Sequence, residues 1–185
     1  MSLGLTLAIL FVFVWVAMYV FRLEATREAL PLYSASERLW VLLTPAILSV
    51  HFALASITLS ATSSMPLPRA LLGVVAFASG AGLWFWGRVA IGPLRVRRSP
   101  EAPPLRFRRD GPFRIVRNPL YLGLLIAAGA QLLVAATAIL GLTFTLCAIA
   151  LAVRSSQEER RLHAQLGGAY AEYCREVKRL IPFIW

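Results

Sequence analysis

A run of basic and polar residues lies directly before a long apolar segment of this chain, where a membrane helix would begin. The run includes Arg114, Arg117, Asn118 and Tyr121. Asn118 is a good N-cap, and Pro119 is favoured at the first position of a helix. A helix N-terminus carries unpaired N–H groups and a partial positive charge, so together with Arg117 it predicts a receptor for a carboxylate or phosphate. Lipid headgroups are the alternative ligand for these arginines.

Two adjacent carboxylates, Glu158 and Glu159, follow the last apolar segment after only four residues. They are expected at the same membrane depth as Arg117, where they would accept an ammonium group or ribose hydroxyls. The alternative is a solvated helix face on which they pair with Arg161 or His163. An anionic site that faces a cationic one would suit a zwitterionic amino-acid cofactor.

Gly80, Gly82 and His51 each have a structural and a functional interpretation. Small residues in a membrane helix usually serve helix packing, but they also make room for a flat ring or for a ligand that approaches the backbone. A histidine within a membrane segment is a candidate site residue, although Thr44 or Ser49 could share a purely structural hydrogen bond with it.

The composition places these residues in a membrane. The 185 residues are 58% hydrophobic and 15% charged, and the mean hydropathy is +0.69. A soluble domain is about 45–50% apolar and about 25% charged, so we expect an all-α integral membrane protein. The net charge of +10 then fits loop arginines near anionic lipid, and we expect no nucleic-acid partner. The sequence has no nucleophile–base order and no metal-ligand grouping, so we expect no metal.

Segment lengths predict five membrane helices in one domain, residues 1–185. A span needs about 20 apolar residues, and the first three predicted spans are 3–21, 39–60 and 70–91. We interpret the first as a membrane helix and not as a cleaved signal. The apolar stretch 119–153 is too long for one crossing and is predicted to turn at residues 135–137. This gives spans 119–135 and 138–153, a loop at 92–118 and a tail at 154–185.

Charge asymmetry decides between five spans and four. With five, 18 of the 19 Lys and Arg residues lie on one side and only Arg69 on the other, whereas four spans divide them 12 to 7. The positive-inside rule therefore favours five spans, with the N-terminus outside and the tail in the cytoplasm. Apolar residues recur at helical spacing along 155–179, which predicts an amphipathic interfacial helix broken near Gly167.

Residues 111–123 run Gly-Pro-Phe-Arg-Ile-Val-Arg-Asn-Pro-Leu-Tyr-Leu-Gly. This resembles the signature Gly-Pro-Phe/Tyr-x-x-x-Arg-His-Pro-x-Tyr-x-Gly of the isoprenylcysteine carboxyl methyltransferase and phospholipid methyltransferase superfamily. The paired glutamates, Leu162, Gly167, Tyr170, Tyr173 and the ending Pro182-Phe183-Ile184 are similar to the second half of the family pattern. Gly80 and Gly82 are similar to the Gly-x-Gly element of phospholipid N-methyltransferases.

The resemblance implies S-adenosylmethionine as the cofactor, bound on the cytoplasmic side, and a lipophilic methyl acceptor that enters from the membrane lipids. It implies Glu158 and Arg175 as catalytic candidates. The residues that it implies for cofactor binding are Gly80, Gly82, Arg117, Asn118, Pro119, Tyr121, Gly123, Glu158 and Glu159.

Two departures from the family pattern affect the expected chemistry. Asn118 replaces the family's histidine, so it keeps hydrogen-bonding capacity but cannot titrate near neutrality. Lys178 stands where carboxyl methyltransferases have the proline of Arg-Val-Pro, and Glu176 where they have its arginine, which weakens the case for a prenylcysteine carboxylate. An NADPH-dependent membrane reductase of the steroid 5-alpha reductase type and a non-catalytic lipid-binding membrane protein are the alternative functions.

Overall fold

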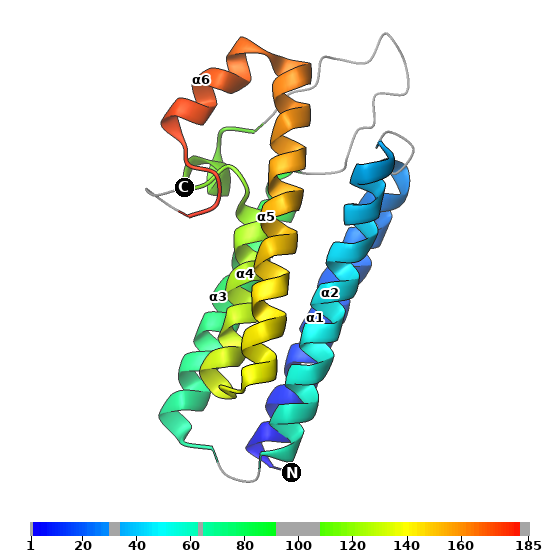
Figure 1. The fold of residues 1–185 in the computed structure, drawn as a ribbon. Coiled ribbons are helices and arrows are strands. Elements are labelled where there is room, and N and C mark those ends of the chain that lie inside the picture. The colour runs from blue at the N-terminus through cyan, green and yellow to red at the C-terminus, as the bar shows by residue number, and fades with distance from the viewer. Residues whose placement is uncertain (1, 30–33, 63–64, 92–107, 182–185) are drawn as a thin grey trace.

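The protein is a bundle of long helices capped at one end by a short helix and its connecting segments (Figure 1). The computed structural model describes residues 2–29, 34–62, 65–91 and 108–181. Most of the basic loop predicted at 92–118 and the Pro182–Trp185 ending lie outside the described residues. The helices are α1 Leu3–Ala29, α2 Ala35–Ala61, α3 Leu67–Ile91, α4 Pro119–Val134, α5 Ala138–Leu166 and α6 Gly168–Glu176, and a 3-10 turn, η2, covers Gly111–Arg114.

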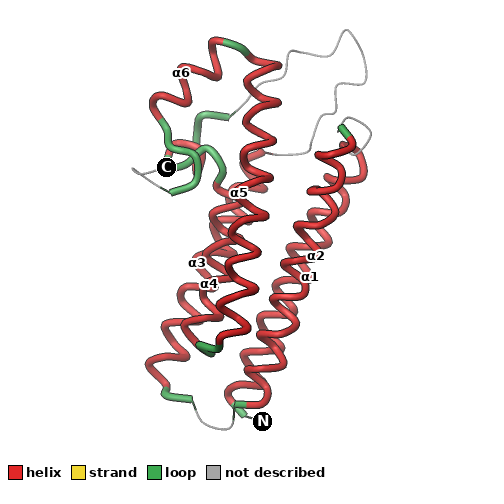
Figure 2. Tube along the Cα trace, in the orientation of Figure 1, coloured by secondary structure: helices red, strands yellow, loops and turns green. Residues whose placement is uncertain are grey.

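The described part of the chain contains no strand, so the all-α class is confirmed (Figure 2). Four of its helices, α1, α2, α3 and α5, are long and apolar enough to cross a membrane. The fifth apolar helix, α4, has only 16 residues. At about 1.5 Å per residue it is roughly 24 Å long, somewhat less than a hydrocarbon core of about 30 Å.

The predicted turn at residues 135–137 is confirmed, because α4 ends at Val134 and α5 begins at Ala138. The Thr137 side chain accepts a hydrogen bond from the Leu140 N–H and so caps the new helix. On the neighbouring helix, Arg69 Nε donates to the carbonyl of Leu133 at 2.7 Å. The one basic residue predicted for the far side thus satisfies a carbonyl of the last turn of α4.

α5 continues well past the predicted end of its span at residue 153. It runs unbroken to Leu166, so the paired glutamates lie on the same helix as the membrane segment. The predicted break is at Gly167, whose φ of +56° is accessible to glycine at little cost. There the chain turns into α6, which folds back toward the start of α4 (Figure 1).

Aromatic stacking and close backbone contacts hold the bundle together. Phe11 of α1 stacks on Phe77 of α3 with ring centroids 4.2 Å apart, and Trp15 stacks on Phe52 of α2 at 4.6 Å. Between α3 and α4 the backbones approach at Gly80, where an added Cβ would lie 2.6 Å from the Ala127 nitrogen. Such close approach is a common way for membrane helices to associate.

His51 is part of this packing. Its Nδ1 lies 2.8 Å from the Thr143 hydroxyl of α5, and its Nε2 lies 3.1 Å from the Ala128 carbonyl of α4. A carbonyl can only accept, so Nε2 carries the proton and donates. Both ring nitrogens therefore have partners on neighbouring helices, and the structural interpretation of His51 holds, although Thr44 and Ser49 are not those partners.

Candidate functional site

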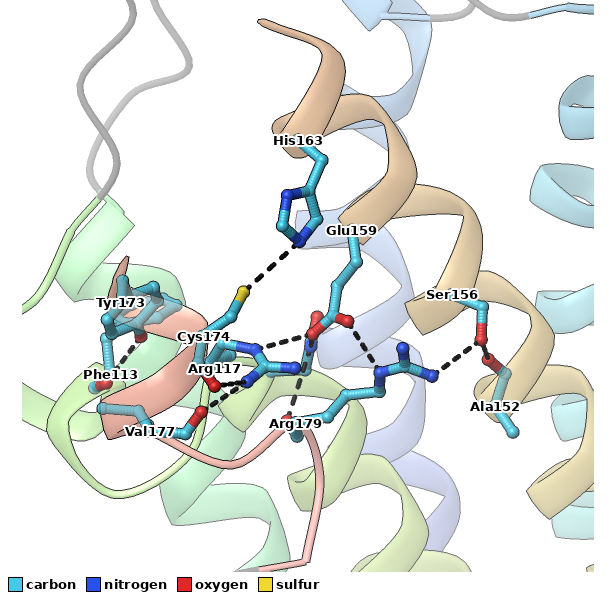
Figure 3. A network of polar contacts seen from close by, with 11 residues as sticks. Phe113, Arg117, Ala152, Ser156, Glu159, His163, Tyr173, Cys174, Val177 and Arg179 are labelled. Atoms are coloured by element: carbon cyan, nitrogen blue, oxygen red, sulfur yellow. Dashed lines mark hydrogen bonds and ion pairs between the residues drawn. The ribbon is translucent and has the colours of Figure 1, made fainter. Parts of the chain in front are cut away.

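Glu159 is the centre of a buried ion-pair cluster where α5 passes the start of α4 (Figure 3). Arg117 Nε donates to Glu159 Oε1 at 2.8 Å, and Arg179 Nε donates to Glu159 Oε2 at 2.7 Å. The Asn118 side-chain amide donates to Oε1 as well, at 3.2 Å. Glu159 is only 4% exposed, so this carboxylate is satisfied almost entirely by protein groups.

Asn118 does not act as the predicted helix cap. It occupies the N-cap position of α4, but its side chain makes no capping hydrogen bond. The amide instead points to Glu159 and to the carbonyl of Arg179. The Asn118 NH2 group therefore helps to stabilise the buried carboxylate of Glu159, which gains from each hydrogen bond that it accepts.

Backbone hydrogen bonds join the segment after α6 to residues 117 and 118. The Arg117 N–H donates to the Lys178 carbonyl at 2.8 Å, and the Asn118 N–H donates to the Arg179 carbonyl at 3.0 Å. Arg117 Nη1 also donates to the carbonyls of Cys174 and Val177. We call residues 177–181 the C-terminal strap, because its backbone holds Arg117 and Asn118 in place.

Glu158 occupies a different environment from its neighbour. Its Oε2 accepts a hydrogen bond of 2.6 Å from the Tyr121 hydroxyl of α4, and the side chain is exposed. The two halves of the sequence pattern therefore meet twice, once at the buried Glu159 and once at the exposed Glu158. Together Arg117, Asn118, Tyr121, Glu158 and Glu159 form what we call the rim site.

The electrostatics of the rim site follow from burial and from the ion pairs. Burial alone would lower the pKa of Arg117, but the hydrogen bond and the charge of Glu159 outweigh it and raise that pKa. Two arginines share one carboxylate, so the buried cluster carries one net positive charge. An anion is the charge that would balance it.

The groups that flank the cluster are kept neutral. Burial raises the pKa of Tyr173 to about 12, and the Tyr173 hydroxyl donates to the Phe113 carbonyl at 2.6 Å. Burial also raises the pKa of the Cys174 thiol, whose Sγ lies 3.5 Å from His163 Nε2. Tyr173 thus fixes α6 against the turn that precedes α4, and Cys174 contacts α5.

Residues 74–164 match the model of the isoprenylcysteine carboxyl methyltransferase family. Over these residues the chain is similar to the isoprenylcysteine carboxyl methyltransferase superfamily. The matched range contains α4, both glutamates and the signature residues 111–123. No curated protein and no solved structure matches the chain. Among the described residues, four helices are long and apolar enough to span a bilayer, and together with this match they support an integral membrane protein.

The structure brings only some of the predicted glycines near the rim site, and none of them faces open space there. Gly80 and Gly123 pack on each other, since a Cβ on either would lie 2.6 Å from a backbone oxygen of the other. Gly82 lies on the exposed face of α3, and a Cβ there would meet nothing within 4 Å. Gly80 and Gly123 therefore hold α3 against α4, and the place of the three glycines in a cofactor site stays a prediction.

Arg175 is not part of the rim site. It is exposed on α6, and the basic side chain from this stretch that reaches the cluster is Arg179. Arg179 was not singled out from the sequence. The strap leaves α6 at Val177, and because this bend is not visible in the sequence, the arginine that turns inward could not be predicted.

Pro119 and Arg114 have simple roles in the folded chain. Pro119 is buried at the first position of α4, where its missing N–H removes a donor that would have no partner in the helix. Arg114 is exposed at the end of η2. Among the described residues, no group of three or more His, Cys, Asp or Glu side chains is placed to hold a metal ion.

Proposed function

We propose that this chain transfers a methyl group from S-adenosylmethionine to a lipophilic acceptor that reaches the rim site from the bilayer. One observation carries the proposal. Residues 117–121 and residues 158–159 are joined by two contacts, Arg117 with Glu159 at 2.8 Å and Tyr121 with Glu158 at 2.6 Å. These are the two stretches on which the family resemblance rests, and they meet where the apolar bundle ends.

The two glutamates would then have different tasks. Glu159 is occupied by two arginines and an amide, so it serves to hold Arg117 and Arg179 in position. Glu158 is exposed and has one identified contact, with Tyr121, which leaves lone pairs for a ligand. We therefore assign the ammonium group or the ribose hydroxyls of the cofactor to Glu158 and Tyr121.

The residues present fit a zwitterionic cofactor. The net positive charge of the cluster and the N-terminus of α4 both favour an anion, which is the chemistry of the cofactor's carboxylate. Glu158 supplies the opposite charge from α5, where it is next to Glu159. The cationic group would be recognised within one helical turn of the anionic one.

Positioning and exclusion of water are the contributions expected from the protein. S-adenosylmethionine, when bound, supplies a methyl group on a positively charged sulfur that acts as its own leaving group. A lone pair of the acceptor forms the new bond to the methyl carbon, and the electron pair of the broken carbon–sulfur bond stays on sulfur. Such a displacement needs few catalytic side chains, so Asn118 need not be a base.

We further propose that α4 crosses the membrane as a short fifth span. The turn at residues 135–137 and Arg69 then lie outside, and the rim site lies in the cytoplasm with nearly all the basic residues. This orientation exposes the site to a soluble cofactor. The methyl acceptor would then arrive from the bilayer. This acceptor would be a lipid headgroup, a prenylcysteine-like carboxylate or another hydrophobic molecule.

Titration calorimetry of the purified protein with S-adenosylhomocysteine tests the proposal. We expect one site per chain, and we expect NADPH under the same conditions to give no heat beyond dilution. A folded protein that binds NADPH and ignores S-adenosylhomocysteine would instead support a reductase. Binding of neither would refute the assignment of a cofactor to the rim site.

A further inference from the structure

Ser155 is a buried hydroxyl without a partner among the described residues. The side chain is fully buried, and its Oγ makes no hydrogen bond. Four other helical serines, Ser49, Ser56, Ser79 and Ser156, behave differently, because each donates to the carbonyl four residues earlier. The Ser155 hydroxyl does not make this local bond, and an unmade hydrogen bond at a buried site is destabilising.

The position of Ser155 on α5 relates it to the rim site. It precedes Glu159 by four residues, so both lie on the same face of the helix, about 6 Å apart along its axis. Glu159 contacts Asn118 at the start of α4. One turn earlier on α5, the same helix face lies closer to the apolar part of the bundle than this contact does. Ser155 is therefore deeper in the bundle than the charged cluster.

Below Ser155 the same face of α5 is apolar. Leu151 and Cys147, the next two positions at this spacing, are fully buried in the hydrophobic core. Above Ser155, Glu159 is already saturated by Arg117, Arg179 and Asn118. Ser155 is thus the polar group at the boundary between the hydrophobic interior and the cluster.

We infer that the Ser155 hydroxyl binds the polar end of the lipophilic methyl acceptor. An amphipathic molecule that enters from the bilayer would keep its apolar part in the apolar bundle and place its polar end at Ser155. A hydroxyl both donates and accepts, so it can hold a carboxylate, hydroxyl or amine next to the cofactor. This inference rests on the proposed function, and it assigns to Ser155 the acceptor and not the cofactor.

The test compares Ser155→Ala with Ser156→Ala in the full-length protein. Two quantities are measured: the affinity for S-adenosylhomocysteine by calorimetry, and the transfer of tritium from methyl-labelled S-adenosylmethionine into a chloroform extract of the expression host's membrane lipids. We expect Ser155→Ala to melt no lower than wild type and to bind S-adenosylhomocysteine within twofold of wild type, while transfer at limiting lipid falls at least tenfold. Ser155→Thr, which restores the hydroxyl, should recover most of the transfer.

Ser156→Ala is the matched control. Its hydroxyl donates to Ala152 and accepts from Arg179, so its loss should lower the melting temperature and leave the dependence on lipid concentration unchanged. A tenfold loss of S-adenosylhomocysteine affinity in Ser155→Ala would show that Ser155 serves the cofactor, and unchanged transfer would show that it serves no ligand. Wild-type protein that binds S-adenosylhomocysteine but labels no lipid would overturn the acceptor role alone, whereas wild type that does not bind it would overturn the proposed function.

Discussion

At the scale of single residues, the two adjacent glutamates are expected to differ sharply when each loses its charge. Glu159→Gln leaves Arg117 and Arg179 in a buried site without a counter-charge, and breaking a buried ion pair in this way costs about 3 kcal/mol or more. We expect a large fall in thermal stability, which can be measured on the detergent-purified protein. A melting temperature within a degree or two of wild type would contradict the arrangement of the cluster.

Glu158→Gln is the matched change at the neighbouring position. Glu158 is exposed and has one identified hydrogen bond, so stability should change by less than about 1 kcal/mol. Affinity for S-adenosylhomocysteine should instead fall about tenfold or more, because the charge that meets the ligand is gone. If calorimetry found the affinity unchanged, the division of tasks between the two glutamates would be wrong.

The dependence of stability on pH offers a third prediction at this scale. Since burial raises the pKa of Tyr173 from 10.0 to about 12, folding favours its protonated form. Its contribution to stability is therefore complete below pH 10 and is lost as pH rises from 10 to 12. Thermal unfolding of wild type and Tyr173→Phe at pH 9 and pH 11.5 should show the advantage of wild type shrinking. A gap between the two proteins that is the same at both pH values would refute this.

The sequence predicted that Arg117 and Glu159 lie near each other, but not which ion pairs they form. The depth of Arg117 and Glu159 relative to the apolar segments was enough to bring them to one rim. It was not enough to show that they pair with each other, because that depends on Arg179, which arrives from a strap beyond α6. The side chain of Asn118 was assigned to its helix for the same reason, since its preferred partner is distant in sequence.

At the scale of helices, the contact between α3 and α4 depends on Gly80 and not on Gly82, which lies two residues further along. A Cβ at Gly80 would lie 2.6 Å from backbone atoms of α4, which cannot shift as a side chain can. Gly80→Leu should therefore separate the two helices and lower thermal stability strongly, while Gly82→Leu should leave it nearly unchanged. Equal effects of the two variants in thermal unfolding would contradict the packing.

The spacing of small residues could not distinguish Gly80 from Gly82. Residues two apart on a helix differ by about 200° in direction, so only one of the pair faces a given neighbour, and the sequence does not show which one. Segment length was a better guide to the hairpin. A run of 35 apolar residues cannot cross a bilayer once as a single upright helix, and the turn was predicted at the residues where it occurs.

At the scale of the whole molecule, the proposed five spans place the hairpin turn and the rim site on opposite sides of the membrane. Ala136 is exposed in the turn, and Cys174 lies at the rim. In intact cells, a membrane-impermeant maleimide should label Ala136→Cys in a Cys174→Ser background. Cys174 itself should react only after the membrane is made permeable. If Ala136→Cys were labelled only after permeabilisation, the turn would not be exposed outside the cell. The five-span topology would then be contradicted.

The central claim, that the rim site holds the cofactor, is tested most directly by determining an experimental structure of the protein with S-adenosylhomocysteine. We predict density for one ligand at the start of α4, with its amino-acid end between Arg117 and Glu158 and in contact with Tyr121. Density for the ligand elsewhere in the bundle, or a rim site unchanged at saturating ligand, would contradict the account.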